Sequence, residues 1–310
     1  KWRVRYRRAT PTPYGDMEPI SQERINRWKS ASLPYRAYAH GEAYSAFEKK
    51  ANKGKAALFS ITKEMLSAMS EDFLDYLEAQ PYVDGNANAT NRQWHGLESM
   101  FGTTGAAISN SPMSNPQDSY AGLRTDLDHY GQGSWSADSG AGYPTGTGDL
   151  EYHFWSPAVY DYTSTEFSAS THDWQNQARE CMRYAQMYQG NLHRAEPDVW
   201  ITNAELYRQF KDSLEDKERI IVNSDRELTK LGFNNINVEG VPMVSGYGIT
   251  DAVVYGLKWD KMDLRCMDGQ LLQKEDDDDI TTLTKRLVIT CWANMRFQSP
   301  CYFTKLQGSA

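Results

Sequence analysis

The chain of 310 residues has a formal net charge of −8 and is 40% hydrophobic and 24% charged, which is ordinary for a globular protein of one large or two medium domains. The acidity disfavours a protein that condenses nucleic acid, because such binding depends on cation contacts with phosphate. No apolar run approaches the roughly 18 residues of a membrane-spanning helix, and no signal peptide opens the sequence.

The first predicted element is a long hairpin with a basic stem. In residues 1–8, KWRVRYRR, Trp2, Val4 and Tyr6 alternate with arginines, the period of a half-buried strand. A turn-rich segment, ATPTPYGDMEP, follows, and the chain returns through KSASLPYRAY, where Pro34 marks an edge strand. An isolated two-stranded hairpin is marginal in water. We therefore expect it to lie on its own body or on a neighbouring molecule.

A long helix is predicted next, over residues 42–79, because apolar residues recur there three or four positions apart. Gly54 interrupts the pattern and is expected to bend or split the helix. An unbroken helix of about 35 residues would form a rod of roughly 50 Å. The pattern stops at QPYVDGNAN, which contains Pro and Gly.

Residues 102–150 are rich in Gly, Ser, Thr, Asn and Asp, and we expect a long loop or irregular β structure. A phosphate-binding loop is disfavoured, because G-x-x-x-x-G-K-[ST] is absent. Helices and strands then alternate. The predicted helices are 171–188 and 203–220, with Asn203 as N-cap, and the predicted strands are 198–202, 235–245, 251–259 and 262–266.

The acidic run KEDDDD, residues 274–279, is expected to be a solvated loop. A calcium loop would need ligands at spaced positions around a glycine, and that spacing is absent. One long, well-buried strand is predicted over residues 284–306, in which Leu287, Ile289 and Cys291 alternate with Val288 and Trp292.

Motifs for catalysis and for metal binding are not found. None of the six histidines lies in H-E-x-x-H or pairs with another at i, i+4, and no G-x-S-x-G is present. Nine tryptophans and nineteen tyrosines could line a carbohydrate groove, although such residues more often fill cores and interfaces. The four cysteines contain no C-x-x-C pair, so we expect reduced thiols in a protein made in a cytosol. No cofactor is expected.

Several segments together resemble the major capsid proteins of tailed bacteriophages, which have the Hong Kong 97-type fold. KWRVRY with its return strand resembles the extended loop (E-loop) of that family, and the helix at 43–79 resembles its spine helix. PDVWITNAELYRQF, LGFNNINVEGVPMVSG and VVYGLKWDKMDLRC resemble segments of its axial domain. QPYVDGN, WHGLESMFG and the final TKRLVITCWANMRFQSPCYFTKLQG resemble peripheral-domain segments. SPC replaces the usual Asn-Pro near the end.

This resemblance implies an α+β fold. It places an E-loop hairpin at 1–41, a peripheral domain with the spine helix and the Gly-rich loop at 42–155, an axial domain at 156–275 and a peripheral C-terminal strand at 276–310. Family precursors carry an N-terminal arm, and often a scaffolding segment, before the E-loop. We expect maturation cleavage or disorder to account for the start at Lys1.

The implied function is a major capsid protein that self-assembles into hexamers and pentamers of an icosahedral shell around double-stranded DNA. The implied partners are further copies of the chain, portal, scaffold and decoration proteins, and DNA held by weak non-specific contacts, with no membrane. The implied location is the virion capsid, assembled in the host cytoplasm. An encapsulin-like nanocompartment shell and a carbohydrate-active enzyme are the alternatives.

The resemblance also implies roles in assembly for particular residues. The basic stem is expected to meet acidic residues of a neighbour's spine helix, such as Glu64, Glu71 and Asp72, while aromatic residues form the apolar anchor. Gly240 is expected to permit a β-bulge and Pro242 to lie at an edge or a bulge. Lys29 and Asn294 are conceivable partners in a covalent cross-link. The expected interface residues are Trp2, Arg3, Arg5, Tyr6, Arg7, Arg8 and Trp28.

Overall fold

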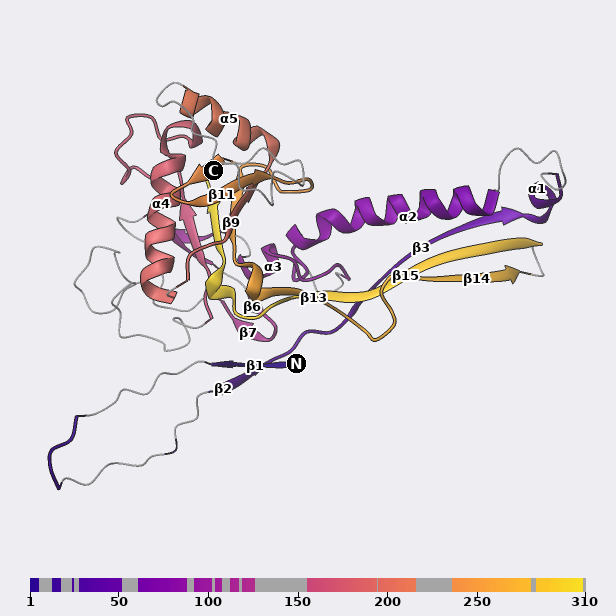
Figure 1. The fold of residues 1–310 in the computed structure, drawn as a ribbon, viewed down its shortest axis with the longest axis horizontal. Helices are drawn as coiled ribbons and strands as arrows, with labels where there is room; N and C mark the ends of the chain where they lie inside the picture. Colours follow the sequence, from indigo (N-terminus) through magenta and orange to yellow (C-terminus); the bar gives the residue numbers. More distant parts are fainter. Residues whose placement is uncertain are drawn as a thin grey trace. The chain divides into compact units, whose positions relative to one another are not determined.

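The computed structural model contains two compact units (Figure 1). The first unit comprises Lys1–Leu33, Ser99–Met262 and Phe297–Ala310, and the second comprises Pro34–Glu98 and Asp263–Arg296. The residues that the structure describes are 1–5, 13–17, 24, 28–51, 61–87, 92–101, 104–107, 112–116, 119–125, 155–193, 195–215, 236–279 and 283–308. Among them, no helix is long and apolar enough to cross a membrane.

The first unit is built on an eight-stranded mixed sheet in the order β10-β11-β9-β12-β16-β8-β5-β4. β9 and β12 lie inside this sheet, and all their residues are buried, as expected for strands covered on both faces. The strands are β4 (Thr104–Ala107), β5 (Met113–Pro116), β8 (Ala158–Asp161), β9 (Val199–Thr202), β10 (Ile236–Val238), β11 (Val241–Ser245), β12 (Val253–Leu257) and β16 (Thr304–Gln307).

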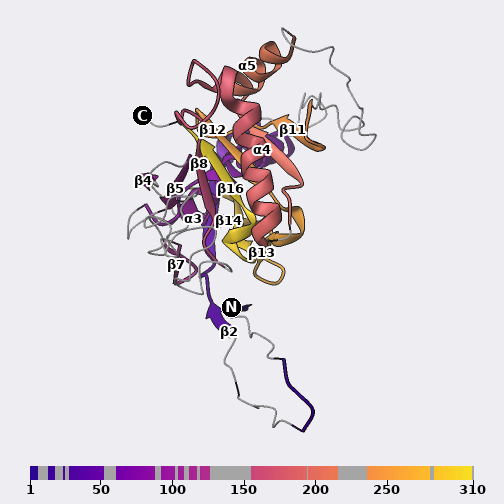
Figure 2. The ribbon, with the colours of Figure 1, turned by 90° about the vertical axis from the view of Figure 1, so that its left-hand side faces the viewer.

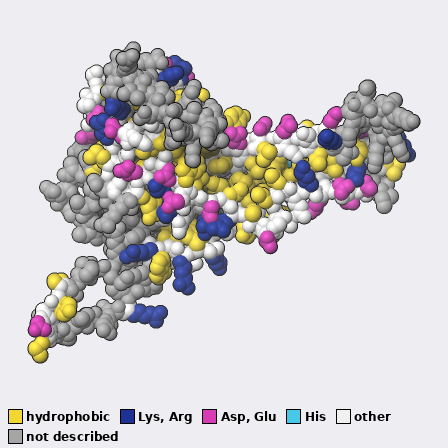
Figure 3. Space-filling view, in the orientation of Figure 1, with side chains coloured by type: hydrophobic (Ala, Val, Ile, Leu, Met, Phe, Trp, Pro, Cys, Tyr) yellow, Lys and Arg dark blue, Asp and Glu magenta, His cyan; other side chains and the backbone are white. Residues whose placement is uncertain are grey.

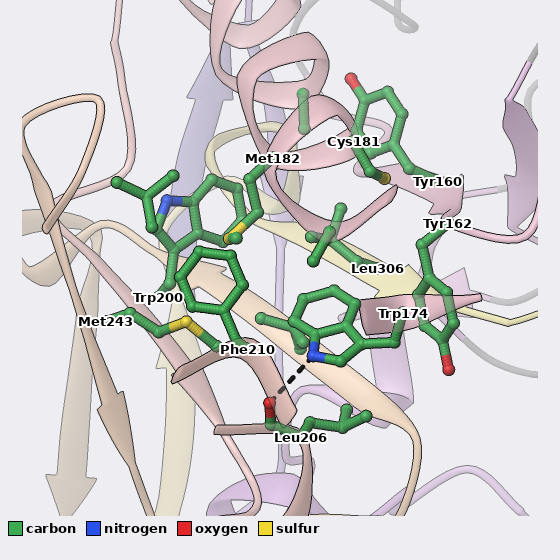
Figure 4. Packing of buried hydrophobic residues seen from close by; sticks show 14 of the residues in the cluster. Tyr160, Tyr162, Trp174, Cys181, Met182, Trp200, Leu206, Phe210, Met243 and Leu306 are labelled. Carbon is green, nitrogen blue, oxygen red and sulfur yellow. Dashed lines mark hydrogen bonds between the residues drawn. The ribbon is translucent and has the colours of Figure 1, made fainter. Parts of the chain in front are cut away.

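Two helices, α4 (Trp174–His193) and α5 (Ala204–Glu215), pack against this sheet, and α4 runs across it (Figure 2). Their apolar faces meet in a core that includes Trp200 and Phe210 (Figure 4). The indole Nε1 of Trp174 donates a hydrogen bond to the Leu206 carbonyl at 2.9 Å, which joins the two helices. Asn203 Oδ1 accepts from the Leu206 amide at 2.9 Å, so the predicted N-cap is confirmed.

Smaller elements complete the first unit. β1 and β2 form a hairpin, and β6 and β7 pair with each other. These elements are β1 (Trp2–Arg5), β2 (Trp28–Ala31), β6 (Ser119–Tyr120), β7 (Leu123–Arg124), α3 (Glu98–Phe101, which begins at the last residue of a second-unit segment) and the 3₁₀ turns Trp259–Lys261 and Pro300–Tyr302. Most of the glycine-rich stretch 102–150 lies outside the described residues, and its described parts form the short strands β4 to β7.

The second unit has a four-stranded sheet in which β15 (Thr284–Phe297) pairs with β3 (Arg36–Ser45) along one edge and with β14 (Gln273–Asp279) and β13 (Met262–Cys266) along the other. The helix α2 (Ile61–Ala79) packs on β3, with Met69 and Phe73 buried (Figure 1). The remaining elements are α1 (Ala46–Ala51) and a 3₁₀ turn at Gln80–Tyr82. The predicted alternation in β15 is confirmed, with Leu287, Ile289 and Cys291 buried and Trp292 exposed.

Four element predictions need correction. Residues 42–45, expected to be helical, end strand β3, because they pair with β15. The return strand of the hairpin ends at Ala31, and the residues from Arg36 onward pair with β15 instead. The acidic run is strand β14 rather than a loop. The predicted strand 284–306 is two strands in two sheets, β15 and β16, separated by the turn at Pro300. Gly54 lies outside the described residues.

Candidate assembly surfaces

The β1–β2 hairpin has two chemically different faces. Its register pairs Trp2 with Ala31 and Arg5 with Trp28. Val4 and Ala31 are buried, with 6% and 0% exposure, so the face that they share with Trp2 points inward. The opposite face carries Arg3, Arg5 and Trp28. This division follows from the strict alternation of the sequence, because successive side chains of a strand point to opposite faces.

Trp2 binds its own subunit. Its Nε1 donates to the Gln298 carbonyl at 3.0 Å, and its ring lies 6.4 Å from that of Tyr120. The Ser32 amide adds a backbone hydrogen bond to the Ala121 carbonyl at 3.0 Å. These contacts hold the base of the hairpin against the rest of the first unit. The sequence pattern of the hairpin does not reveal this role of Trp2.

The outer face of the hairpin is open to solvent. Trp28 is 54% exposed, and Arg3 and Arg5 are exposed as well. Lys and Arg side chains gather over this part of the molecule (Figure 3). An exposed tryptophan paired with an arginine is a composition expected of an interface anchor. Tyr6, Arg7 and Arg8, the other nominated interface residues, lie outside the described residues.

The nominated acidic partners lie on α2. Glu64, Glu71 and Asp72 are all exposed, and acidic side chains follow this helix in Figure 3. In isolation the helix thus offers an acidic surface of the sign that a basic hairpin from another copy would match. Such pairs orient an encounter more than they strengthen it.

The segment around Gly240 is a hairpin and not a bulged strand. β10 and β11 are antiparallel, with Val238 paired to Val241. The two turn residues, Glu239 and Gly240, have φ angles of 50° and 89°, as a type I′ turn requires. β11 lies between β10 and β9, so Pro242 is not on an edge strand, and it precedes the first β11 residue that pairs with β9. The missing N–H of Pro242 therefore interrupts no bond of that ladder.

Glu239 connects this turn to α4. Its Oε1 accepts hydrogen bonds from Arg183 Nε and Nη2 at 3.1 and 2.6 Å, and Arg179 Nη2 lies 3.7 Å away. The hydrogen bond from Arg183 lowers the pKa of the Glu239 carboxyl. The turn is thereby held in place by a partly exposed ion cluster, which contributes little to stability but fixes an orientation.

Asn294 holds a buried polar cluster in the second unit. It is 4% exposed. Its Nδ2 donates to the Pro34 carbonyl and to His95 Nδ1, both at 2.8 Å, and its Oδ1 accepts from the His95 amide at 2.9 Å. Burial and the nearby Arg36 charge lower the pKa of His95 to about 4. Lys29 is half-buried in β2. The cross-link stays a prediction, and the burial of the Asn294 amide counts against it.

Three of the four thiols are buried in a way that keeps them protonated. All four cysteines are free, and Cys181, Cys291 and Cys301 are buried. Burial raises the pKa of Cys301 to about 12 and raises those of Cys181 and Cys291 as well. A thiol that stays protonated is inert at neutral pH.

Comparison with known proteins shows which solved structures share this architecture. No family model matches the sequence, and no curated protein matches it. Among solved structures, the chain resembles the cyanophage A-1(L) capsid asymmetric unit, with a TM-score of 0.61 and 16% identity over 99% of this chain and 86% of that chain. It resembles the capsid of the empty GTA particle with a TM-score of 0.57 and 10% identity, over 99% and 90% of the two chains. The chain has a bacteriophage capsid fold.

A third structure with this capsid fold, the mature capsid of bacteriophage PhiM1, matches with a TM-score of 0.50 and 10% identity over 99% of this chain and 81% of that chain. The expected combination of helices and sheets is confirmed. The Asn294–His95 cluster and the link from Glu239 to α4 could not be predicted from the sequence. Both join residues more than 50 positions apart, and neither leaves a local pattern.

Proposed function

We propose that this chain is the major capsid protein of a tailed bacteriophage and that its work is architectural. The observation that carries the proposal is the extent of the likeness, because 99% of the chain matches capsid subunits and covers 86% to 90% of their length. No large part of the chain is left over for another activity. The exposed outer face of the β1–β2 hairpin, with Trp28 at 54% exposure, supports the proposal independently.

In this proposal the β1–β2 hairpin is the E-loop, α2 is the spine helix and the β10–β11 hairpin belongs to the axial domain of a Hong Kong 97-type subunit. Copies gather as hexamers and pentamers, and the shell closes around double-stranded DNA in the host cytoplasm. Portal and scaffold proteins, and in some shells decoration proteins, join this assembly. A net charge of −8 suits a wall that has to release the genome as well as contain it.

The test is to purify the expressed chain and examine it by size-exclusion chromatography and electron microscopy over a range of concentrations. Rings of five and six subunits and closed shells are expected. A chain that stays monomeric at high concentration, with its hairpin resistant to protease, would contradict the proposal.

The contents of the shell are tested by treating particles from infected cells with nuclease and analysing the nucleic acid that stays protected. Protected double-stranded DNA is expected. Shells that hold protein cargo and no DNA would favour the encapsulin-like alternative.

A further inference from the structure

Three side chains that can bind a metal converge in the second unit. His40 and Glu42 lie on β3, and Asp72 lies on α2. The nearest ligand atoms of the three all lie within 4.8 Å of one another. His40 and Glu42 are half-buried, and Asp72 is exposed. The group therefore lies where the helix packs on the strand, at a point that solvent ions can reach.

The geometry of the two elements brings the group together. Residues two apart on a strand share a face and are separated by about 6.6 Å, and four residues of a helix rise about 6 Å. A step of two residues along β3 therefore covers about the same distance as a step of four residues along α2, so facing pairs of side chains recur along the two elements. One such step places Tyr38 against Tyr76, with ring centroids 5.6 Å apart. The next places His40 and Asp72 together.

The imidazole of His40 lacks a hydrogen-bond partner at one nitrogen. Its Nε2 is buried and makes no hydrogen bond to any described residue. The nearest carboxylate oxygen, Glu42 Oε1, is 3.9 Å away, which is too long for a hydrogen bond. A buried polar atom without a partner costs free energy, and the neighbouring carboxylates of Glu42 and Asp72 repel each other. A bound cation would offset both costs.

We propose that His40 Nε2 and the carboxylates of Glu42 and Asp72 bind one divalent transition-metal ion of the zinc class. Zn²⁺ binds His nitrogen and Asp or Glu oxygen at about 2.0–2.2 Å, which sets tetrahedral ligand atoms about 3.3–3.6 Å apart. His40 Nε2 and Glu42 Oε1 are 3.9 Å apart and the three ligand atoms lie within 4.8 Å of one another, so small rotations of the Glu42 and Asp72 side chains would close the set around an ion. The imidazole ligand disfavours Ca²⁺ and Mg²⁺, which prefer oxygen alone. Water supplies the remaining position.

The ion would join strand β3 to helix α2. The two −1 charges of the carboxylates would neutralise the ion, and the strand and helix would be linked through three side chains rather than by packing alone. This inference concerns one subunit and does not depend on the proposed shell function. Folding and zinc binding stabilise each other, since an ion bound only by the folded chain shifts the unfolding equilibrium.

The test is equilibrium dialysis of the purified, unassembled chain against micromolar ZnCl₂, followed by metal analysis and thermal unfolding. We expect one zinc ion per chain and a raised Tm. H40Q and D72N should each weaken binding by at least the 10- to 100-fold that loss of a supporting partner costs. D75N, the same charge change on an exposed residue of the same helix, is the control and should bind as the wild type does.

Cobalt gives a second readout that is independent of stability. Co²⁺ in the wild-type chain should show visible absorption bands of a nitrogen- and oxygen-bound ion, and H40Q should abolish them. D72N only converts an exposed carboxylate to an amide, so it keeps the test valid if H40Q fails to fold. Absence of zinc binding by the wild type, or equal binding by the wild type and D72N, would overturn the proposal.

Discussion

Asn294 is the residue whose loss should destabilise the second unit most clearly. Replacing it with Ala leaves the His95 amide and the Pro34 carbonyl without their partner, and each buried group left unsatisfied costs about 1–3 kcal/mol. We therefore expect Asn294→Ala to lower the urea midpoint of the unassembled chain. Thr290→Ala, a half-buried position of the same strand, is the matched control. Equal midpoints for the two variants would show that the cluster contributes nothing.

His95 should make stability depend on pH. Its pKa is about 4 in the folded chain, because burial, helped by Arg36, disfavours the charged form, and about 6.5 when unfolded. Between these values the unfolded chain binds the extra proton, so stability is present above pH 6.5 and is lost as the pH falls towards 4. The loss is about 3 kcal/mol at most.

The variant His95→Asn isolates this contribution. An Asn side-chain oxygen can take the place of Nδ1 as acceptor for Asn294 but does not titrate. Urea unfolding at pH 7.5 and at pH 5 should show a larger loss for the wild type than for the variant. Parallel pH profiles would mean that His95 does not set the acid sensitivity.

At the scale of elements, two glycines test two different constraints. A Cβ on Gly240 would meet nothing within 4 Å, but its φ is +89°, so Gly240→Ala should cost about 1 kcal/mol for backbone conformation alone. A Cβ on Gly256 would lie 2.6 Å from Trp200 Cζ3. Gly256→Ala should therefore disturb core packing, at about 1–3 kcal/mol.

Asn distinguishes the two causes. Because Asn tolerates a positive φ, Gly240→Asn should recover most of the stability that Gly240→Ala loses, as measured by urea unfolding. Gly256→Asn should be worse than Gly256→Ala, since it adds volume and a polar group to a buried strand. If Gly256→Asn is more stable than Gly256→Ala, or Gly240→Asn is no more stable than Gly240→Ala, then backbone strain at Gly240 and crowding at Gly256 are the wrong explanations.

An element could be predicted from the sequence where neighbouring residues determine its structure, and could not be predicted where a distant strand determines it. Helix α5 was predictable from Asn203 and an apolar repeat, and both are local. Strand β14 was not, because six charged residues in a row read as a loop, and only the ladder with β15 holds them extended. Its Asp276 pairs with Lys285 at 2.5 Å, a cross-strand contact that no single segment reveals.

At the scale of the whole molecule, the order of elements pointed to the fold, whereas the contacts within it could not be read from the sequence. The alternation of Trp2 and Val4 with arginines predicted a hairpin face, and the structure has that face. The sequence could not show that Trp2 donates a hydrogen bond to the carbonyl of Gln298 in its own chain, 296 positions away. Contacts between residues so far apart in the chain depend on the topology of the fold, and they cannot be predicted from the pattern of a single sequence.

This difference between the two tryptophans leads to the last prediction. Trp28→Ala removes a ring that is 54% exposed, and such surface changes usually alter stability by less than about 0.5 kcal/mol, so the urea midpoint of the unassembled chain should move little. If Trp28 anchors the hairpin on a neighbouring copy, its loss costs about 2 kcal/mol per contact, and the concentration needed for assembly rises about 30-fold. Light scattering over a concentration series measures this threshold.

Trp2→Ala is the contrasting variant. It removes the hydrogen bond to Gln298 and the contact with Tyr120, so it should expose the hairpin to protease in the unassembled chain before any assembly is attempted. Trp28→Ala should leave that protease pattern unchanged. Because an anchor acts only between copies, a Trp28→Ala chain that assembles at the wild-type concentration would remove Trp28 from the interface and leave Arg3 and Arg5 as the described candidates on that face.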